Sequence, residues 1–390
     1  MRQKKSDGLF WISLIMILLI SIFLISWDVL NMVEKLQPEN VFTISWAVRI
    51  FIFLTAAVSL VGVILEIIEI KKEKSRKLLI RLIVNLFALL LFVFIVILYS
   101  TRDSEKNSYN PPDNAIYSYE EIRIKLPSGD ILAGSLTYPK DIKEKIPGVI
   151  LITGSSPHDR DNSSPEEPRT AYRPFRQIAD RLSSNGIAVL RMDNRGIGES
   201  IGGDIRNMTT EERAKDIEEC IRYLRHRSEF DSLRIGLIGL SEGVSVSHMI
   251  ASHDTLIKAL VFLSGIGSPG KDVLEYQIQQ GVLTKDQLAI LLREDKNTHF
   301  LYEFDPLKTA GKIKQPVLII HGKKDRSVNY TDAYKLEEAI TRNGNKNVTL
   351  KILEGYDHTL LKVNPNGQFY SAKISDEVLM IITDWILKEI

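Results

Sequence analysis

The sequence has almost no cysteine and almost no net charge. Its single cysteine, Cys220, cannot form an internal disulfide or contribute to a thiolate metal cluster. The helical pattern around Cys220 predicts that it is a buried, small apolar residue. The 50 Lys and Arg residues are balanced by 49 Asp and Glu residues, which leaves a net charge of +1. This balance gives no reason to expect nucleic acid or another polyanion as a partner.

Patterns that would bind a metal ion or a nucleotide cofactor are also missing. No group of His, Cys, Asp and Glu residues has the spacing of metal ligands. The segment MDNRGIGES, at 192–200, contains spaced glycines. It lacks both the G-x-G-x-x-G pattern after a first strand and the acidic residue that would bind a ribose. We therefore interpret this segment as a structural loop and expect no cofactor.

Long apolar runs are present, but only in the first hundred residues. Three runs are each long enough to cross a bilayer, which takes roughly 20 residues, and they lie at 9–27, 41–65 and 78–99. Arg81 lies near one end of the third run, where a long side chain can reach the interface. Arg49 weakens the second run: either the apolar part begins just after it, or its side chain reaches the nearby interface. A functional buried charge is the third, less favoured alternative. The first run is too long for a signal-peptide core, and no typical cleavage site follows it. We predict a membrane domain of three transmembrane helices over 1–100 and a polar, extended linker over 101–116.

Basic residues flank these runs unevenly. They gather before the first run and between the second and third: Arg2, Lys4, Lys5, Lys71, Lys72, Lys74, Arg76 and Lys77. The loop between the first two runs contains only Lys35. The positive-inside rule then places the N-terminus in the cytoplasm, and three spans place the rest of the chain outside. We expect a multi-pass protein of the cell membrane with an extracytoplasmic domain.

From Tyr117 onward, short apolar runs alternate with helical patterns. Two runs predict a hairpin (121–126 and 132–138), and six more are typical of buried parallel strands (148–153, 188–193, 234–240, 259–264, 316–321 and 348–353). Helical patterns separate them, at 172–185, 209–228, 243–253, 331–343 and 374–389. This alternation predicts an α/β fold over 117–390, with a doubly wound, mostly parallel sheet.

The region 266–315 interrupts that rhythm, because it contains helical patterns but no strand. We expect it to form a small helical cap over the sheet. Its apolar side chains can line a cavity or pack on the domain: Val273, Leu274, Tyr276, Ile278, Leu288, Ile290, Leu291 and Leu292.

The segment GLSEG, at 239–243, follows one of the buried-type strands and precedes a helix. A serine on such a sharp turn needs small neighbours, because the backbone is strained and the helix packs close to the strand. The turn exposes the hydroxyl at the carboxyl end of the sheet, where open α/β folds bind ligands. We predict that Ser241 is a nucleophile. The alternative is an incidental serine in a glycine-rich turn.

A serine hydroxyl needs an adjacent base, and the sequence has seven histidines. His358 lies after the last predicted strand, where the base falls in the chain order Ser, acid, His. His158 is a rival, because it lies near the loop after the strand at 148–153. The segment HGKKDRSV, after the penultimate strand, supplies Asp325 as the acid that orients the imidazole. His321 ends that strand, and we expect it to be structural.

The negative charge that develops on the substrate oxygen needs two backbone N–H donors. We expect one from Glu242, directly after the nucleophile. The other is expected from Ser155, with Ser156 close behind, in the loop that follows the strand at 148–153. A flexible loop without a catalytic role is the alternative for this second donor.

Taken together, these segments resemble the α/β-hydrolase superfamily over about 117–390. The resemblance is closest to bacterial carboxylesterases of the dienelactone-hydrolase-like and serine-aminopeptidase-like groups. It rests on ITGSSPHDRDN, LRMDNRGIGES, GLIGLSEG, DPLKTAGKIKQPVLIIHGKKDRSV and LEGYDH. It implies a catalytic triad of Ser241, Asp325 and His358, in agreement with the interpretation above. Two positions depart from the pattern: Ser156, where related esterases often have glycine, and Val244, where a second small residue is usual.

We therefore expect a membrane-anchored carboxylesterase that cleaves a small-molecule or lipid-like acyl ester through an acyl-enzyme. An exopeptidase or amidase is the second hypothesis, because the same triad attacks both acyl types. A peptidase acting on free N-termini would need an acidic residue for the ammonium group, and the cap offers Glu275, Asp286, Glu294 and Asp295. A third hypothesis is a membrane-tethered binding module on an inactive hydrolase fold. The complete triad argues against it.

Overall fold

The computed structural model describes residues 109–112, 114–155, 157–163, 172–203, 207–364, 369–371 and 373–390. The chain divides into two compact units, Met1–Ser108 and Tyr109–Ile390, and the described residues belong to the second. Among them, no helix has the length and apolar character needed to cross a membrane. The three predicted spans, the first part of the predicted linker and Ser156 lie outside the described residues.

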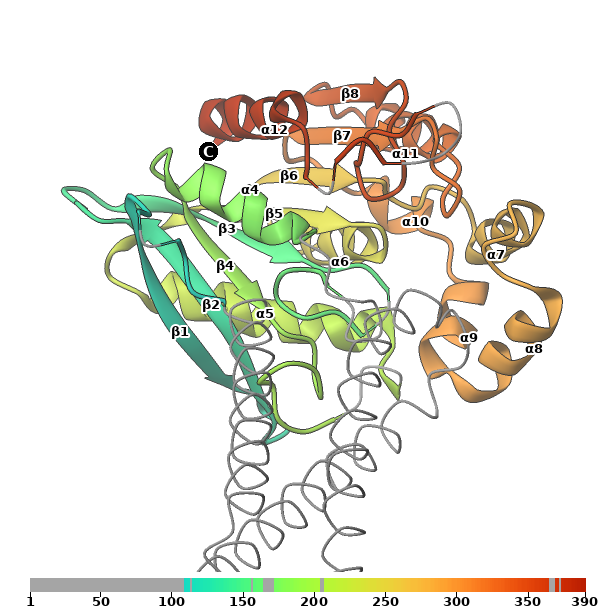
Figure 1. Cartoon of the computed structure of the whole chain (residues 1–390), viewed down its shortest axis with the longest axis horizontal. Helices are drawn as coiled ribbons and strands as arrows, with labels where there is room; N and C mark the ends of the chain where they lie inside the picture. Colours follow the sequence, from blue (N-terminus) through green and yellow to red (C-terminus); the bar gives the residue numbers. More distant parts are fainter. Residues whose placement is uncertain are drawn as a thin grey trace, which may run out of the picture. The chain divides into compact units, whose positions relative to one another are not determined.

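Eight strands of the described residues form one sheet, in the order β1-β2-β4-β3-β5-β6-β7-β8 (Figure 1). Their bounds are β1 Tyr117–Lys125, β2 Ile131–Pro139, β3 Ile146–Ile152, β4 Ala188–Met192, β5 Phe230–Leu240, β6 Ile257–Leu263, β7 Val317–Gly322 and β8 Val348–Leu353. β1 and β2 form an antiparallel hairpin, and β2 is antiparallel to β4. All pairs from β4 to β8 are parallel. The mostly parallel α/β sheet predicted from the sequence is thus present.

Helices cover both faces of the sheet. One apolar layer includes α4 (Pro174–Ser183) and α12 (Asp376–Glu389), and the other includes α5 (Thr210–His226), α6 (Glu242–Ala251) and α11 (Thr331–Arg342). Successive residues of one strand enter opposite layers, as Ile150 and Leu151 of β3 do, and both are buried. The central strands are therefore mostly apolar, because neither face of the sheet meets water, and the few polar side chains on them, such as Arg191 of β4, are buried.

Cys220 lies on the inner face of α5 and is fully buried, as expected. Burial raises the pKa of its thiol, which keeps the thiol neutral and unreactive. The start of α5 is fixed by a capping box, in which the side chain of Thr209 and that of Glu212 each accept a hydrogen bond from the other's backbone N–H.

The chain between β6 and β7 is helical, as predicted for the cap. It forms α7 (Gly270–Gln279), α8 (Lys285–Glu294), α9 (Lys296–Glu303) and the short α10 (Leu307–Ala310). Figure 1 shows α7, α8 and α9 beyond the carboxyl ends of β5 and β6. This position places the cap next to the loops that follow the parallel strands.

Candidate active site

Ser241 occupies a strained turn between β5 and α6. Its backbone has φ of 55° and ψ of −119°, in the half of conformational space that L-residues rarely enter. Its N–H donates to the carbonyl of Leu263 at 2.8 Å, which fixes the turn against β6. A Cβ atom on Gly239 would lie 2.3 Å from the carbonyl oxygen of Gly243, and one on Gly243 would lie 2.2 Å from that of Ile152. Both glycines are therefore required for α6 to pack this closely on β3 and β5.

Val244, which stands where a small residue is usual, fits against a glycine in the loop after β6. Val244 is fully buried, and a Cβ atom on Gly265 would lie 2.7 Å from its side chain. Gly265, two residues after β6, has no side chain, and this leaves room for the side chain of Val244. The larger side chain does not disturb the turn of Ser241.

Asp325 lies in the turn after β7, and only 3% of its surface is exposed. Its Oδ1 accepts hydrogen bonds from the N–H groups of Ser327 and Val328, at 2.7 and 2.8 Å. Its Oδ2 accepts from Nδ1 of His358 at 2.7 Å and from Nε2 of His321 at 2.9 Å. Burial alone would raise the pKa of Asp325, but the two imidazoles hold it well below its usual range. The carboxylate is ionised and fixed on both oxygens.

His321 was expected to be structural, and its side chain contacts Asp325. The ring is fully buried at the end of β7 and binds the same carboxylate oxygen as His358. His321 therefore helps to fix the acid that in turn holds His358. The sequence contained the pair in the segment HGKKD, but only the turn after β7 shows that the two side chains meet.

His358 lies in the loop after β8, and its side chain remains 20% exposed. The loop is fixed by Asp357, whose carboxylate accepts from the N–H groups of Thr359 and Leu361 at 3.0 and 2.8 Å. Burial lowers the pKa of His358, but Asp325 and Asp357 raise it, and the net result is a raised pKa. Because Asp325 holds Nδ1, Nε2 is the ring nitrogen left to take a proton.

A cavity of about 750 Å³ brings most of the predicted site residues together. Ser241, His358 and Ser155 border it, and Asp325 lies behind His358. No hydrogen bond joins the Ser241 hydroxyl to His358 in the described contacts; such bonds often tighten only when substrate binds. His158, the alternative candidate for the base, borders the cavity too. The carboxylate of Asp325, however, binds His358. Within the described ranges, no cluster of His, Cys, Asp and Glu is arranged to hold a metal ion.

The cap forms an apolar wall of this cavity. The apolar cap side chains that border it are Ile266, Val273, Leu274, Val282, Leu283, Leu291, Leu301 and Phe304. Val273, Leu274 and Leu291 were predicted candidates. The other predicted cap residues, Tyr276, Ile278, Leu288, Ile290 and Leu292, do not border the cavity. Tyr276 instead donates its hydroxyl proton to the backbone carbonyl of Asp325 at 2.8 Å.

The two expected N–H donors belong to segments that adjoin Ser241: Glu242 follows it directly, and a Cβ atom on Gly154, next to Ser155, would lie 3.3 Å from the Ser241 Cβ. Glu242 is the first residue of α6, where a backbone N–H has no partner inside the helix. Ser155 is exposed at the cavity. The N–H of the preceding Gly154 already donates to the side chain of Asn162 at 3.1 Å, so it is not available to a substrate.

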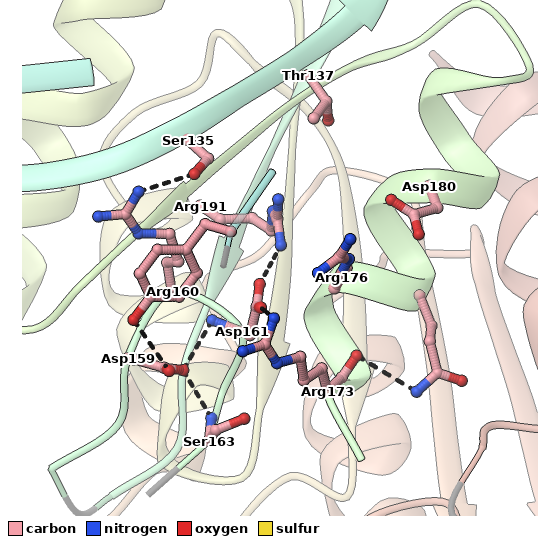
Figure 2. Close-up of polar contacts among 12 residues, drawn as sticks. Ser135, Thr137, Asp159, Arg160, Asp161, Ser163, Arg173, Arg176, Asp180 and Arg191 are labelled. Atoms are coloured by element: carbon pink, nitrogen blue, oxygen red, sulfur yellow. Dashed lines mark hydrogen bonds and ion pairs between the residues drawn. The ribbon is translucent and has the colours of Figure 1, made fainter. Parts of the chain in front are cut away.

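The loop that carries Ser155 is held by the ion pairs of two buried arginines. The fully buried Arg160 pairs with the buried Asp193 at 2.8 Å and also with Glu121 and Glu199, which are about half-exposed. Arg191 pairs with the buried Asp161 on the same loop (Figure 2). Charges buried in this way are stable only when they are paired, so the pairs fix the course of the loop. The segment at 192–200 supplies Asp193 and Glu199, which agrees with its interpretation as a structural loop.

Three comparisons place this chain among known proteins. The model of the prolyl oligopeptidase family matches residues 174–386, more than half of the chain. An uncharacterized peptidase of Bacillus subtilis, YtmA, is 28% identical over 169 residues, which are 43% of this chain and 63% of YtmA. The chain thus spans less than two thirds of that relative. The uncharacterized protein YfhR of Salmonella typhi is 25% identical over 274 residues, which are 66% of this chain and 82% of YfhR.

Solved structures with the same fold include two esterases. The esterase Pf2001 of Pyrococcus furiosus has a TM-score of 0.54 and 20% identity, covering 72% of this chain and 95% of its own. Est1E of Butyrivibrio proteoclasticus, solved with ferulic acid, has a TM-score of 0.52 and 20% identity, covering 69% and 98%. At this level of identity the likeness establishes the α/β-hydrolase fold alone.

Proposed function

We propose that this chain, which belongs to the prolyl oligopeptidase family and is a serine hydrolase with an α/β-hydrolase fold, is a carboxylesterase. One observation carries the proposal: Ser241 and the Asp325-bound His358 border the same cavity, and most of the cap residues that line this cavity are apolar. Such a cavity suits the acyl part of an ester better than a charged or strongly polar group.

Apart from substrate and water, the reaction uses only groups of the chain that are already named. Ser241 attacks the ester carbonyl carbon while Nε2 of His358 takes the hydroxyl proton, and Asp325 stabilises the imidazolium. The N–H groups of Glu242 and Ser155 stabilise the oxygen that becomes negative. Collapse of this intermediate breaks the ester C–O bond, and His358 returns its proton to the departing alcohol. Water then attacks the acyl-enzyme with His358 as base, which releases the carboxylic acid and restores Ser241.

The cap wall gives an expectation for the acyl chain. Each methylene buried against such a wall contributes about 0.8 kcal/mol, or nearly fourfold in binding. We therefore expect kcat/KM to rise with acyl length until the cavity is full, and then to fall. A free acyl ester and an ester on a lipid-like molecule share this chemistry.

An exopeptidase is the second candidate, and Asp295 is the observation in its favour. Asp295 borders the cavity, whereas Glu275, Asp286 and Glu294 are exposed and do not. One oxygen of Asp295 already accepts a hydrogen bond from the N–H of Thr298 at the start of α9. A free amino terminus would have to bind the remaining oxygen. The names of the family and of YtmA also favour a peptidase.

We further propose that residues 1–100 anchor the enzyme in the cell membrane, with the N-terminus in the cytoplasm and the hydrolase domain outside. Three long apolar runs and the excess of basic residues on one side support this arrangement. Protease added to intact cells without their wall should cut the linker at 101–116. Complete protection until the cells are lysed would reverse the orientation.

Activity-based labelling tests the chemistry directly. A fluorophosphonate should label the wild-type chain but not Ser241→Ala, which should remain folded and lack turnover. A panel should then compare acyl esters with aminoacyl amides that have a free or an acetylated amino group. Preference for esters supports the carboxylesterase, and cleavage only of free-amino amides would replace it with the exopeptidase. An unlabelled, inactive wild type would favour the binding module instead.

A further inference from the structure

The carboxylate of Glu242 lies at the centre of a buried polar network directly behind the nucleophile. The side chain is fully buried, and it receives donors from two other helices. Arg213 and Thr210 of α5 contact its Oε1 at 2.9 and 2.8 Å. The amide nitrogen of Asn297, in α9 of the cap, lies 3.0 Å from both carboxylate oxygens. A buried carboxylate without water depends on these donors for its position.

The same network reaches the loop on the other side of Ser241. A second nitrogen of Arg213 donates to the backbone carbonyl of Thr153 at 2.8 Å. Thr153 directly follows β3 and lies two residues before Ser155, the second expected N–H donor. One arginine therefore connects the residue that carries the first donor to the loop that carries the second.

Asn297 is the contribution of the cap to this network. It is 9% exposed, it is the buried residue of α9, and it borders the cavity. Its neighbour Lys296 also ties α9 to α5, through an ion pair with Glu212 at 2.8 Å. That pair is largely exposed and does not involve Glu242. The two adjacent residues thus connect the same helices, but only one of them contacts the residue after the nucleophile.

We propose that Asn297 is a positioning residue, through which the cap sets the orientation of the Glu242 backbone N–H. The inference rests on the proposed function, since it requires that N–H to stabilise the substrate oxygen. Oxyanion donors act only at about 2.7–3.1 Å, and small displacements near a reacting centre reduce rates steeply. Anchoring the Glu242 side chain restricts rotation of the first turn of α6. The cap therefore assists catalysis even for acyl groups too short to touch its apolar wall.

The test compares Asn297→Ala and the isosteric Asn297→Asp with Lys296→Ala as the matched control. The two readouts are the rate at which a fluorophosphonate labels Ser241, and kcat and KM for an acetyl ester. Asn297→Ala should lower the labelling rate and kcat by about tenfold or more, with KM within about twofold, because a hydrogen bond to a charged group is lost. Asn297→Asp keeps the shape but turns the donor into an acceptor facing Glu242, so its loss should be at least as large. Lys296→Ala should stay within about twofold of wild type.

Several results would overturn the inference. One is a wild-type labelling rate and acetyl-ester kcat in Asn297→Asp, which remains informative if Asn297→Ala does not fold. Another is an equal loss in Lys296→Ala, which would mean that α9 matters only as a packing element. A change confined to the KM of the acetyl ester, with the labelling rate and kcat of wild type, would assign Asn297 to substrate binding at the cavity wall instead. A wild-type chain that is not labelled at Ser241 would remove the proposed function, and the inference with it.

Discussion

The sheet and the cap are stabilised in different ways. The central strands are buried on both faces, whereas α8 has no buried residue and α9 has only Asn297. The cap nevertheless makes polar contacts with both halves of the site, namely the acid Asp325 that holds His358 and Glu242, the residue after Ser241. Tyr276 donates to the carbonyl of Asp325, and Asn297 donates to the carboxylate of Glu242. Apolar burial holds the sheet together, and directed hydrogen bonds align the cap with the site.

This contrast predicts that the acid fixed by the sheet has the largest effect on activity. Asp325→Asn should lower kcat by about a thousandfold or more, because an amide does not hold His358 in the required tautomer. The charge of Asp325 raises the pKa of His358, against the effect of burial. Wild-type activity should therefore fall as pH decreases through a value above the ordinary histidine pKa of about 6.5.

In Asp325→Asn, the acid limb should move to lower pH. The measurement is the pH profile of kcat/KM for both proteins. The same acid limb in both would contradict the assignment of Asp325 as the partner that sets the charge of His358.

The second-largest difference between the sheet and the cap should appear in the free energy of unfolding. Ile238→Ala, in the fully buried part of β5, should lower the free energy of unfolding by about 2–5 kcal/mol. Leu288→Ala, on the half-exposed α8, should lower it by less than about 1 kcal/mol. Urea unfolding of the full chain measures both. Equal losses would show that the cap depends on apolar packing as much as the sheet does.

The cavity wall can be tested with two adjacent residues of α8. Leu291 borders the cavity, whereas Ile290 is 48% exposed and does not. Leu291→Trp should lower kcat/KM for long acyl esters by about tenfold or more, because the added volume shortens the cavity. The acetyl ester should change by less than about twofold. Ile290→Trp is the control, and a similar loss in that variant would point to a general disturbance of α8.

The smallest expected effect concerns the contact of α7 with the acid loop. Tyr276→Phe removes one neutral hydrogen bond to the Asp325 carbonyl, worth about 1 kcal/mol, and should lower kcat by about fivefold. Tyr334→Phe, at a tyrosine that is 47% exposed, is the control. An unchanged kcat in Tyr276→Phe, or an equal loss in Tyr334→Phe, would mean that the contact of Tyr276 does not support the acid.

Much of the sheet could be predicted because its signals are local. A strand buried on both faces must be mostly apolar, and this pattern identified β3 to β7 directly. β5 nevertheless begins at Phe230 rather than at the predicted Arg234. The residues that follow Phe230 are mostly polar, and it is Phe230 that pairs with Ile146, far away in the chain, before the register shifts. No local pattern reports such a pairing.

Arg213 shows what a closer examination of the sequence could have found. It falls in the helical repeat of α5 residues that face inward, together with Ala214, Cys220 and Leu224. A charge on an otherwise buried face needs a buried partner, and this requirement would have drawn attention to Arg213. The sequence pattern could not have identified Glu242 as the partner, because Glu242 lies on another helix.

The sequence by itself determined the alternating α/β architecture, the strained GLSEG turn and the order of Ser241, Asp325 and His358. Each of these depends on residues that are neighbours in the chain or on the fixed order of strands. Only the tertiary structure decided that His321 shares the carboxylate of Asp325, and that Tyr276 and Asn297 of the cap reach the two halves of the site. The contacts of the cap join residues about fifty positions apart, between elements whose relative placement is set by packing of the whole domain. A polar side chain on a cap helix has the same local pattern whether it faces water or a buried carboxylate.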